Sequence, residues 1–176
     1  PQNPTASRIG VAVADSPEGP FRNSGRPLPM MQDGFEAIDP MAFTDPKSGK
    51  TYLYAGGSAG AKLRVFEMNA DLLSIAREIP VETPPRFTEG AFMHLAHGRY
   101  HLTYSHGGWR DASYSVHHAS ADSPTGPWTY HGAILTSDAN HKGPGHHSFI
   151  NDPRTGQLLI VYHRWNNRSG DGPYSG

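Results

Sequence analysis

Short runs of apolar or alternating residues follow one another along this chain, and clusters of proline and glycine separate them. Such runs are typical of β-strands joined by tight turns, because successive side chains of a strand face opposite sides of its sheet. The clearest predicted strands cover residues 9–14, 51–54, 63–68, 99–104 and 158–162. The one candidate helix, residues 70–78, is short and runs into Pro80, so we interpret it as a turn or edge connection. The pattern predicts an all-β chain.

Two turn motifs recur at the same spacing. The motif Asp-Ser-Pro-x-Gly-Pro followed by an aromatic residue occupies residues 15–21 and again 122–128. The motif Asp-Pro-x-Ser/Thr-Gly occupies residues 45–49 and 152–156, and a predicted strand follows it each time. Members of both pairs lie 107 positions apart. Two independent matches at one spacing indicate an internal structural repeat.

The same spacing aligns Asp39 with His146, and Glu89 lies between them, 50 residues after the first and 57 before the second. Units of about 50 residues built of short strands are typical of the blades of a β-propeller. We expect the innermost strand of each blade to line a central channel, so polar residues at equivalent positions of these strands would converge on one axis. Taken alone, Glu89 is better explained by a structural ion pair than by a catalytic role. The alignment of Glu89 with Asp39 and His146 favours a functional role for Glu89.

Composition narrows the class of function. The 176 residues suffice for one domain with a hydrophobic core. A net charge of −1 argues against nucleic acid or an anionic membrane as the main partner, and no apolar run approaches the roughly 18 residues of a membrane helix. The absence of cysteine excludes a disulfide framework and thiolate chemistry. The first residues are polar and form no signal peptide, so the sequence leaves the compartment open between secreted and cytoplasmic.

Five short motifs follow one another over nearly the whole chain. They are Ile9-Gly10-Val11-Ala12 with the turn at 15–21, Ile38-Asp39-Pro40, Thr88-Glu89-Gly90, the turn at 122–128, and Gly145-His146-His147-Ser148 with Tyr162-His163-Arg164. Each motif alone is weakly specific, but the ordered set resembles glycoside hydrolase family 43. That family consists of five-bladed β-propeller glycosidases acting on plant polysaccharides that contain arabinose and xylose. The resemblance implies a five-bladed β-propeller and a carbohydrate substrate.

The resemblance also implies roles for individual residues. Family members are inverting enzymes that use an Asp general base, a Glu general acid, and a second Asp that positions the acid and tunes its pKa. Glu89 matches the acid, and Asp39 matches the tuning Asp, which we expect to stay ionised. His146 matches a central histidine that in many members lies beside a water-coordinated calcium or similar ion. Arg164 matches a substrate-contacting arginine, and no organic cofactor is implied.

Several other side chains are candidates for lesser roles. Phe92, Tyr104 and Trp109 are aromatic residues that could stack on sugar rings, although aromatic residues in strands more often belong to the core. The remaining histidines do not form a His-Glu-x-x-His motif, so the sequence does not support a zinc site. We expect His147 to point to the opposite face of its strand from His146.

The chain departs from the family pattern in one large respect. The family's catalytic base lies on blade I, upstream of the motif at residues 9–12, and Asp15, Asp33 and Asp45 do not begin a strand equivalent to that of Asp39. We therefore interpret residues 1–176 as a partial catalytic propeller domain. It would lack blade I and most of blade II and end within blade V. An upstream segment or another chain would complete the propeller, and this chain alone would be inactive.

The sequence leaves alternative functions open. The first is an α-L-arabinofuranosidase and the second a β-xylosidase, both removing sugar units from plant cell-wall polysaccharides or oligosaccharides. A third, of a different class, is a non-catalytic carbohydrate-binding or inactive propeller fragment, because the general base is absent. Sugar, linkage and exo or endo action are not fixed by these motifs.

Overall fold

The computed structural model describes residues 7–30, 33–57 and 60–166. Within these ranges the chain forms twelve strands and no helix, which confirms the all-β prediction, and no helix there could cross a membrane. The strands are β1 (Gly10–Val13), β2 (Arg22–Pro27), β3 (Met41–Thr44), β4 (Thr51–Ala55), β5 (Arg64–Met68), β6 (Ile75–Ile79), β7 (Glu89–Ala96), β8 (Arg99–His106), β9 (Ser115–Ala121), β10 (Thr129–Leu135), β11 (His141–Asn151) and β12 (Leu158–Asn166).

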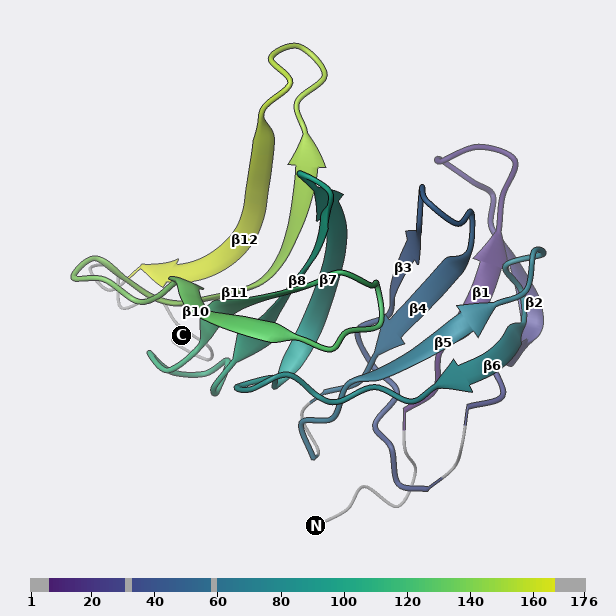
Figure 1. The fold of residues 1–176 in the computed structure, drawn as a ribbon, viewed down its shortest axis with the longest axis horizontal. Coiled ribbons are helices and arrows are strands. Elements are labelled where there is room, and N and C mark those ends of the chain that lie inside the picture. The colour runs from purple at the N-terminus through teal and green to yellow at the C-terminus, as the bar shows by residue number, and fades with distance from the viewer. Residues whose placement is uncertain (1–6, 31–32, 58–59, 167–176) are drawn as a thin grey trace.

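The described strands form four antiparallel sheets, each made of strands that are consecutive in the chain. The first sheet is β1–β2, the second β3–β6, the third β7–β10 and the fourth β11–β12. Figure 1 shows them following one another in chain order, from the purple β1–β2 pair to the yellow-green β11–β12 hairpin. Successive meander sheets of this kind are the blades of a propeller. The assignment of these sheets to particular numbered blades stays a prediction.

The second and third sheets pack face to face through an apolar core. Side chains of β4 and β5 meet side chains of β7, β8 and β9. Tyr54, Val65, Leu102 and Tyr104 are completely buried members of this core. Removing one such side chain from water contributes about 1.5–3 kcal/mol. This packing fixes where β7 begins relative to β4, and β7 begins with Glu89.

Three tyrosine hydroxyls of this core donate hydrogen bonds, since a buried hydroxyl without a partner is destabilising. The acceptors are the carbonyl oxygens of Pro124 (from Tyr54, 2.6 Å) and Pro85 (from Tyr104, 2.7 Å) and Asp45 Oδ1 (from Tyr100, 2.8 Å). The Tyr100 bond joins β8 of the third sheet to the turn after β3 of the second. Directional bonds therefore reinforce the apolar contact between the two sheets.

A separate core covers the other face of the second sheet. Leu53, Ala55 and Phe66 from β4 and β5 pack there against Ile9 and Leu28 of the first sheet region. Alternation along β4 explains both cores, since neighbouring residues of a strand face opposite sides. The second sheet is thus buried on both faces, as an interior blade must be.

The repeat found in the sequence is present in the structure. In both Asp-Pro-x-Ser/Thr-Gly turns the glycine amide donates to the aspartate carbonyl oxygen at 2.8 Å. The side chains of Asp45 and Asp152 also accept the same pair of bonds, from the amide two residues later and from the Ser48 or Thr155 hydroxyl. The candidate helix is a turn over residues 70–74 followed by β6, which confirms its interpretation as a connection.

A row of histidines crosses one face of the third sheet, and its first member also contacts the fourth sheet. His94, His101, His118 and His131 come from β7, β8, β9 and β10, and their rings stack at 5.2, 5.1 and 4.8 Å between neighbouring centroids. His94 also packs against Phe149 of β11 at 4.9 Å. Burial, followed by repulsion from neighbouring histidines, lowers the pKa of His94 and of His118 to about 4. His94 and His118 are therefore neutral at pH 7.

Acidification should destabilise the full-length protein between pH 6.5 and about 4. A histidine whose pKa is near 6.5 when unfolded and about 4 when folded binds more protons in the unfolded state throughout this window, so stability falls as pH falls. We expect a lower urea midpoint at pH 5 than at pH 7. His118→Gln should flatten this dependence, whereas His97→Asn, at an exposed turn, should preserve it. An unchanged pH dependence in His118→Gln would contradict a role of the row in acid stability.

Candidate active site

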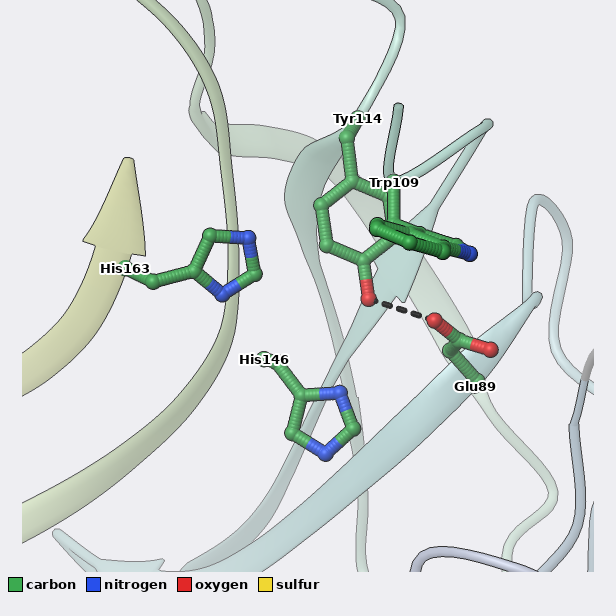
Figure 2. Close-up of a pocket in the computed structure, with 5 residues that line it drawn as sticks. All are labelled: Glu89, Trp109, Tyr114, His146 and His163. Atoms are coloured by element: carbon green, nitrogen blue, oxygen red, sulfur yellow. Dashed lines mark hydrogen bonds between the residues drawn. The ribbon is translucent and has the colours of Figure 1, made fainter. Parts of the chain in front are cut away.

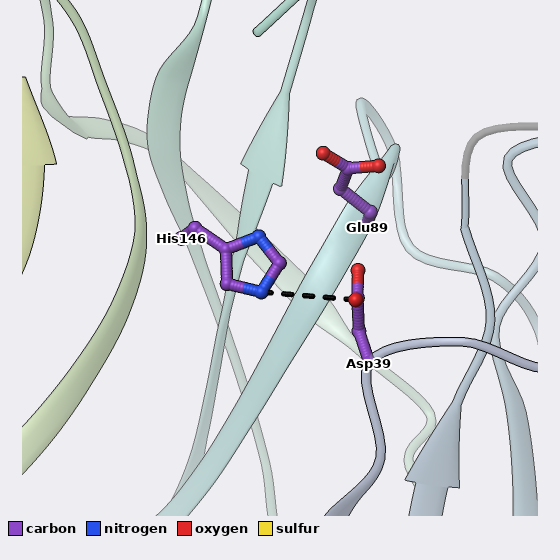
Figure 3. A group of neighbouring side chains, drawn as sticks. All are labelled: Asp39, Glu89 and His146. Carbon is purple, nitrogen blue, oxygen red and sulfur yellow. Dashed lines mark ion pairs between the residues drawn. The ribbon is translucent and has the colours of Figure 1, made fainter. Parts of the chain in front are cut away.

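The structure brings together the three residues that the register aligned. Asp39 precedes β3, Glu89 opens β7 and His146 lies within β11 (Figure 3). One side-chain oxygen or nitrogen atom from each lies within 4.8 Å of those of the other two. His146 Nε2 and Asp39 Oδ1 are 3.7 Å apart. Three different sheets thus supply one cluster of chemically active side chains.

The register is correct for two of the three residues and off by one for the third. Asp39 and His146 both adopt the left-handed conformation, with φ of 51° and 47°, and the middle sheet has Gly90 in that conformation with φ of 63°. Regular pairing resumes two residues later each time, at Met41–Tyr54, Phe92–Thr103 and Ser148–Val161. Gly90 is therefore the structural equivalent of Asp39 and His146, and Glu89 lies one position earlier.

The left-handed residues have a local cause and a consequence. Asp and His tolerate positive φ better than most residues with a side chain, but the conformation still costs about 1 kcal/mol or more. It interrupts the pairing at the start of each inner strand, between Glu89 and Phe92 and between Gly145 and Ser148. Such bulges turn side chains away from regular strand alternation. Here they direct Asp39 and His146 toward the residue that opens β7.

Burial controls the electrostatics of the two carboxyls. Glu89 is only 7% exposed, and Asp39 is half-buried. Burial raises the pKa of Asp39, His146 pulls that pKa down, and the nearby Glu89 carboxyl and the Gly90 amide add smaller upward and downward effects, so the net direction is upward. The ionised state expected of Asp39 stays a prediction, and burial and the neighbouring Glu89 carboxyl act against it.

A pocket of about 290 Å³ opens beside Glu89 (Figure 2). Its other lining residues are Trp109, Tyr114, His146 and His163. The Tyr114 hydroxyl donates to Glu89 Oε1 at 2.7 Å, and the His163 ring stacks on Tyr114 at 5.6 Å with an interplanar angle of 18°. Burial and the neighbouring His146 lower the pKa of His163. A buried carboxyl at the wall of an open pocket has the surroundings of a proton donor.

Tyr114 and His163 were not among the predicted site residues. Tyr114 stands directly before β9 with no motif around it, and only the folded chain places its hydroxyl near Glu89. His163 was visible in the Tyr162-His163-Arg164 motif, and it pairs with Gly145, the residue before His146. That pairing is visible only in the folded chain, so the motif alone could not select His163 rather than its neighbour.

Two predicted substrate-binding residues lie outside this pocket. Phe92 packs against Phe149 at 5.8 Å and His147 at 6.3 Å, so it belongs to the contact between the third and fourth sheets. Arg164 follows His163 on β12 and is not one of the described residues that line the pocket. Its substrate contact stays a prediction. Trp109, by contrast, lines the pocket and is 40% exposed.

The remaining aromatic and histidine predictions are resolved by burial. Tyr104 is completely buried in the core between the second and third sheets. His147 is buried, and its Nε2 lies 2.6 Å from Thr103 Oγ1, whereas the side chain of His146 is 47% exposed. The two adjacent histidines therefore occupy different environments, in agreement with the sequence argument.

The cluster of Asp39, Glu89 and His146 is also the one group of three metal-ligating side chains found among the described residues. Calcium prefers six to eight oxygen ligands, whereas this group offers two carboxylates and one imidazole nitrogen. Asp39 Oδ2 is buried and has no hydrogen-bond partner, which leaves it available to a ligand. The side chains present fit a divalent ion only if water supplies most of its coordination.

Comparison with known proteins gives a consistent result. A family model described as Glycosyl hydrolases family 43 matches residues 1–175. A β-D-galactofuranosidase of Aspergillus niger is 38% identical over 162 residues, covering 89% of this chain and 46% of the relative. A β-xylosidase of Xylanibacter ruminicola is 32% identical, covering 72% of this chain and 49% of the relative. The chain spans about half the length of these curated relatives.

Comparison with solved structures agrees with the family match. A thermostable family-43 glycoside hydrolase superimposes with a TM-score of 0.80 at 28% identity, covering 97% of this chain and 61% of that one. An α-L-arabinofuranosidase from Clostridium thermocellum superimposes with a TM-score of 0.72 at 31% identity, covering 88% and 53%. The five-bladed propeller fold expected from the sequence is thus the fold of its structural relatives.

Proposed function

This chain belongs to glycoside hydrolase family 43, and from that premise we propose that the full-length protein removes arabinose or xylose units from plant cell-wall polysaccharides or oligosaccharides. We assign it first to the α-L-arabinofuranosidases and second to the β-xylosidases. The observation that carries the proposal is the buried carboxyl of Glu89 at the wall of an open pocket, with Asp39 and His146 beside it. Relatives with both kinds of name support the substrate class.

The proposed reaction is an inverting hydrolysis with Glu89 as general acid. Glu89 gives its proton to the glycosidic oxygen while the bond from that oxygen to the anomeric carbon breaks, and the bonding electrons pass to the oxygen. A water attacks the anomeric carbon from the opposite face, and a carboxylate base accepts the water's proton. The acid and base of such a pair stand about 6.5–9.5 Å apart to accommodate the water.

We assign the base to no carboxylate of this chain. Asp45 is held in a turn by Ser48 and Tyr100, and Asp15 and Asp33 are exposed and lie in no strand start near Glu89. The proposal therefore assigns the base and the remaining blades to an upstream segment or another chain. On this view the present chain alone is inactive, and full activity belongs to the completed propeller.

Asp39 and His146 would support the acid. Burial and the Glu89 carboxyl raise the pKa of Asp39, and His146 offsets part of that rise. We also propose that His146 contacts a water-coordinated calcium or similar ion, with Asp39 nearby. Metal analysis of the dialysed full-length protein tests this, and a His146→Ala variant that retains the same metal content would contradict it.

Trp109 is the proposed sugar platform. Its ring lines the pocket and remains 40% exposed, unlike the aromatic side chains of the core. Exposed aromatic rings beside a catalytic carboxyl bind sugar faces through apolar C–H surfaces. Phe92 is excluded from this role because its ring is occupied by Phe149 and His147.

The second candidate function is non-catalytic carbohydrate binding. It is favoured by the lack of a second carboxylate lining the pocket among the described residues. A pocket with Trp109 and polar side chains would still bind a sugar. Activity of the full-length protein distinguishes the two functions.

Glu89→Gln in the full-length protein should lower kcat for natural glycosides by about 10²–10⁴-fold, because their poor leaving groups need a proton. Aryl glycosides with good leaving groups should lose much less. Initial rates on both substrate classes measure the effect. Glu82→Gln, the same chemical change at an exposed position, is the matched control and should leave both rates unchanged. An equal loss on both classes would remove Glu89 from the acid role.

Asp39→Asn should move the acidic limb of the pH–rate profile to lower pH and lower the maximal rate. Burial raises the pKa of Asp39, so its protonation contributes to the fall in activity as pH decreases. Asparagine does not titrate, so that contribution disappears. The profile of kcat/KM against pH is the measurement, with exposed Asp15→Asn as control. A profile identical to the wild type would leave Asp39 with a purely structural role.

A further inference from the structure

Tyr114 holds the carboxyl of Glu89 in one orientation. It stands directly before β9, its side chain is completely buried, and its hydroxyl donates to Glu89 Oε1 at 2.7 Å (Figure 2). The acceptor is one specific oxygen of the carboxyl. A directed bond from a buried donor restricts rotation of the carboxyl group more than solvent contact can.

The Tyr114 ring is itself fixed on two sides. Gly145 lies against the ring, and a Cβ atom at that position would overlap the ring carbons Cε1 and Cδ1. His163 stacks on the ring at an interplanar angle of 18°. Gly145 and His163 pair across β11 and β12, so the fourth sheet supplies both contacts. The ring is therefore held by the strand that also carries His146.

The hydroxyl of Tyr114 has the protonation state that a donor needs. Burial raises the pKa of Tyr114 well above its usual value, and the Glu89 carboxyl acts in the same direction. Ser105 acts on that pKa in the opposite direction, and the net direction is upward. Ser105 Oγ accepts from the His146 amide at 2.9 Å, which fixes the strand that carries the central histidine.

The opposite side of Glu89 is equally restricted. Gly57 follows β4 of the second sheet, and a Cβ atom there would lie 2.5 Å from Glu89 Cβ. The acid is thus enclosed between a glycine of the second sheet and a tyrosine that the fourth sheet supports. Enclosure from two sides leaves little freedom for the side chain between them.

We propose that Tyr114 is a positioning residue for the acid: its bond to Oε1 keeps the transferable proton on Oε2 and fixes that oxygen relative to the pocket. Because Tyr114 donates to Oε1, a proton on the carboxyl resides on the other oxygen. This inference rests on the proposed role of Glu89 as general acid. It concerns the orientation of the carboxyl and assigns no bond-making step to the tyrosine.

The test compares two deletions of a buried hydroxyl in the full-length protein. Tyr114→Phe removes the donor to Glu89, and Tyr104→Phe removes a hydroxyl that donates to the Pro85 carbonyl oxygen, also at 2.7 Å and from a completely buried ring. Both variants lose one buried hydrogen bond. Loss of stability alone should therefore appear in both, and a catalytic effect should appear only in Tyr114→Phe.

Tyr114→Phe should lower kcat for natural glycosides by about tenfold or more, the usual effect of losing a hydrogen bond to a charged group, with little change in KM. Aryl glycosides with good leaving groups should be much less affected. The alkaline limb of the pH–rate profile should move to higher pH, because an ionised carboxylate loses a donor that stabilised it. Tyr104→Phe should change neither the leaving-group dependence nor the profile.

The outcomes separate this inference from the proposed function. If Glu89→Gln shows the leaving-group dependence of an acid but Tyr114→Phe behaves like Tyr104→Phe, the positioning role is wrong and the acid role stands. If Glu89→Gln shows no such dependence, the acid role of Glu89 is wrong, and the positioning role of Tyr114 falls with it. In the Glu89→Gln background, Tyr114→Phe should lower kcat by a smaller factor than in the wild type, because the proton that Tyr114 positions is gone. Full additivity of the two changes would overturn the inference.

Discussion

The packing of the second sheet on the third determines where every part of the site lies. Tyr54 and Val65 on one side and Leu102 and Tyr104 on the other are buried together, and this contact sets β7 against β4. Because β7 begins with Glu89 and β4 runs into Gly57, the same contact encloses the acid. A change in the apolar core would therefore move the carboxyl, even though none of the described side chains of this core lines the pocket.

The contact between the third and fourth sheets is of a different kind, and it serves a different purpose. It combines the packing of Phe92 and His94 on Phe149 with two hydrogen bonds, Thr103–His147 and Ser105–His146. The first contact relies mainly on aliphatic and aromatic side chains. Hydrogen bonds are directional and therefore specify the position of the groups they join, whereas apolar contacts contribute most of the free energy of folding. The fourth sheet is thereby aligned so that His146 and the support of Tyr114 reach the acid.

Side chains from three sheets meet at Glu89. Tyr114 donates a hydrogen bond to its carboxyl, and Asp39 and His146 lie beside it. Left-handed backbone at Asp39 and His146 is the structural cost of bringing these groups together. A general acid needs such a fixed position, since its proton must reach one oxygen of the substrate.

The local sequence pattern determined the strands, the repeated turns and part of the candidate site. Alternation and turn residues predicted the strands, the 107-residue repeat predicted equivalent turns, and its register predicted that Asp39, Glu89 and His146 converge. Tertiary structure alone decided the rest. It placed Tyr114 on Glu89, selected His163 rather than Arg164 for the pocket, put Phe92 between sheets, and shifted Glu89 one residue from its expected equivalent. The physical reason is that periodicity assigns a residue to a strand and a face, whereas bulges and contacts between sheets decide what that residue touches.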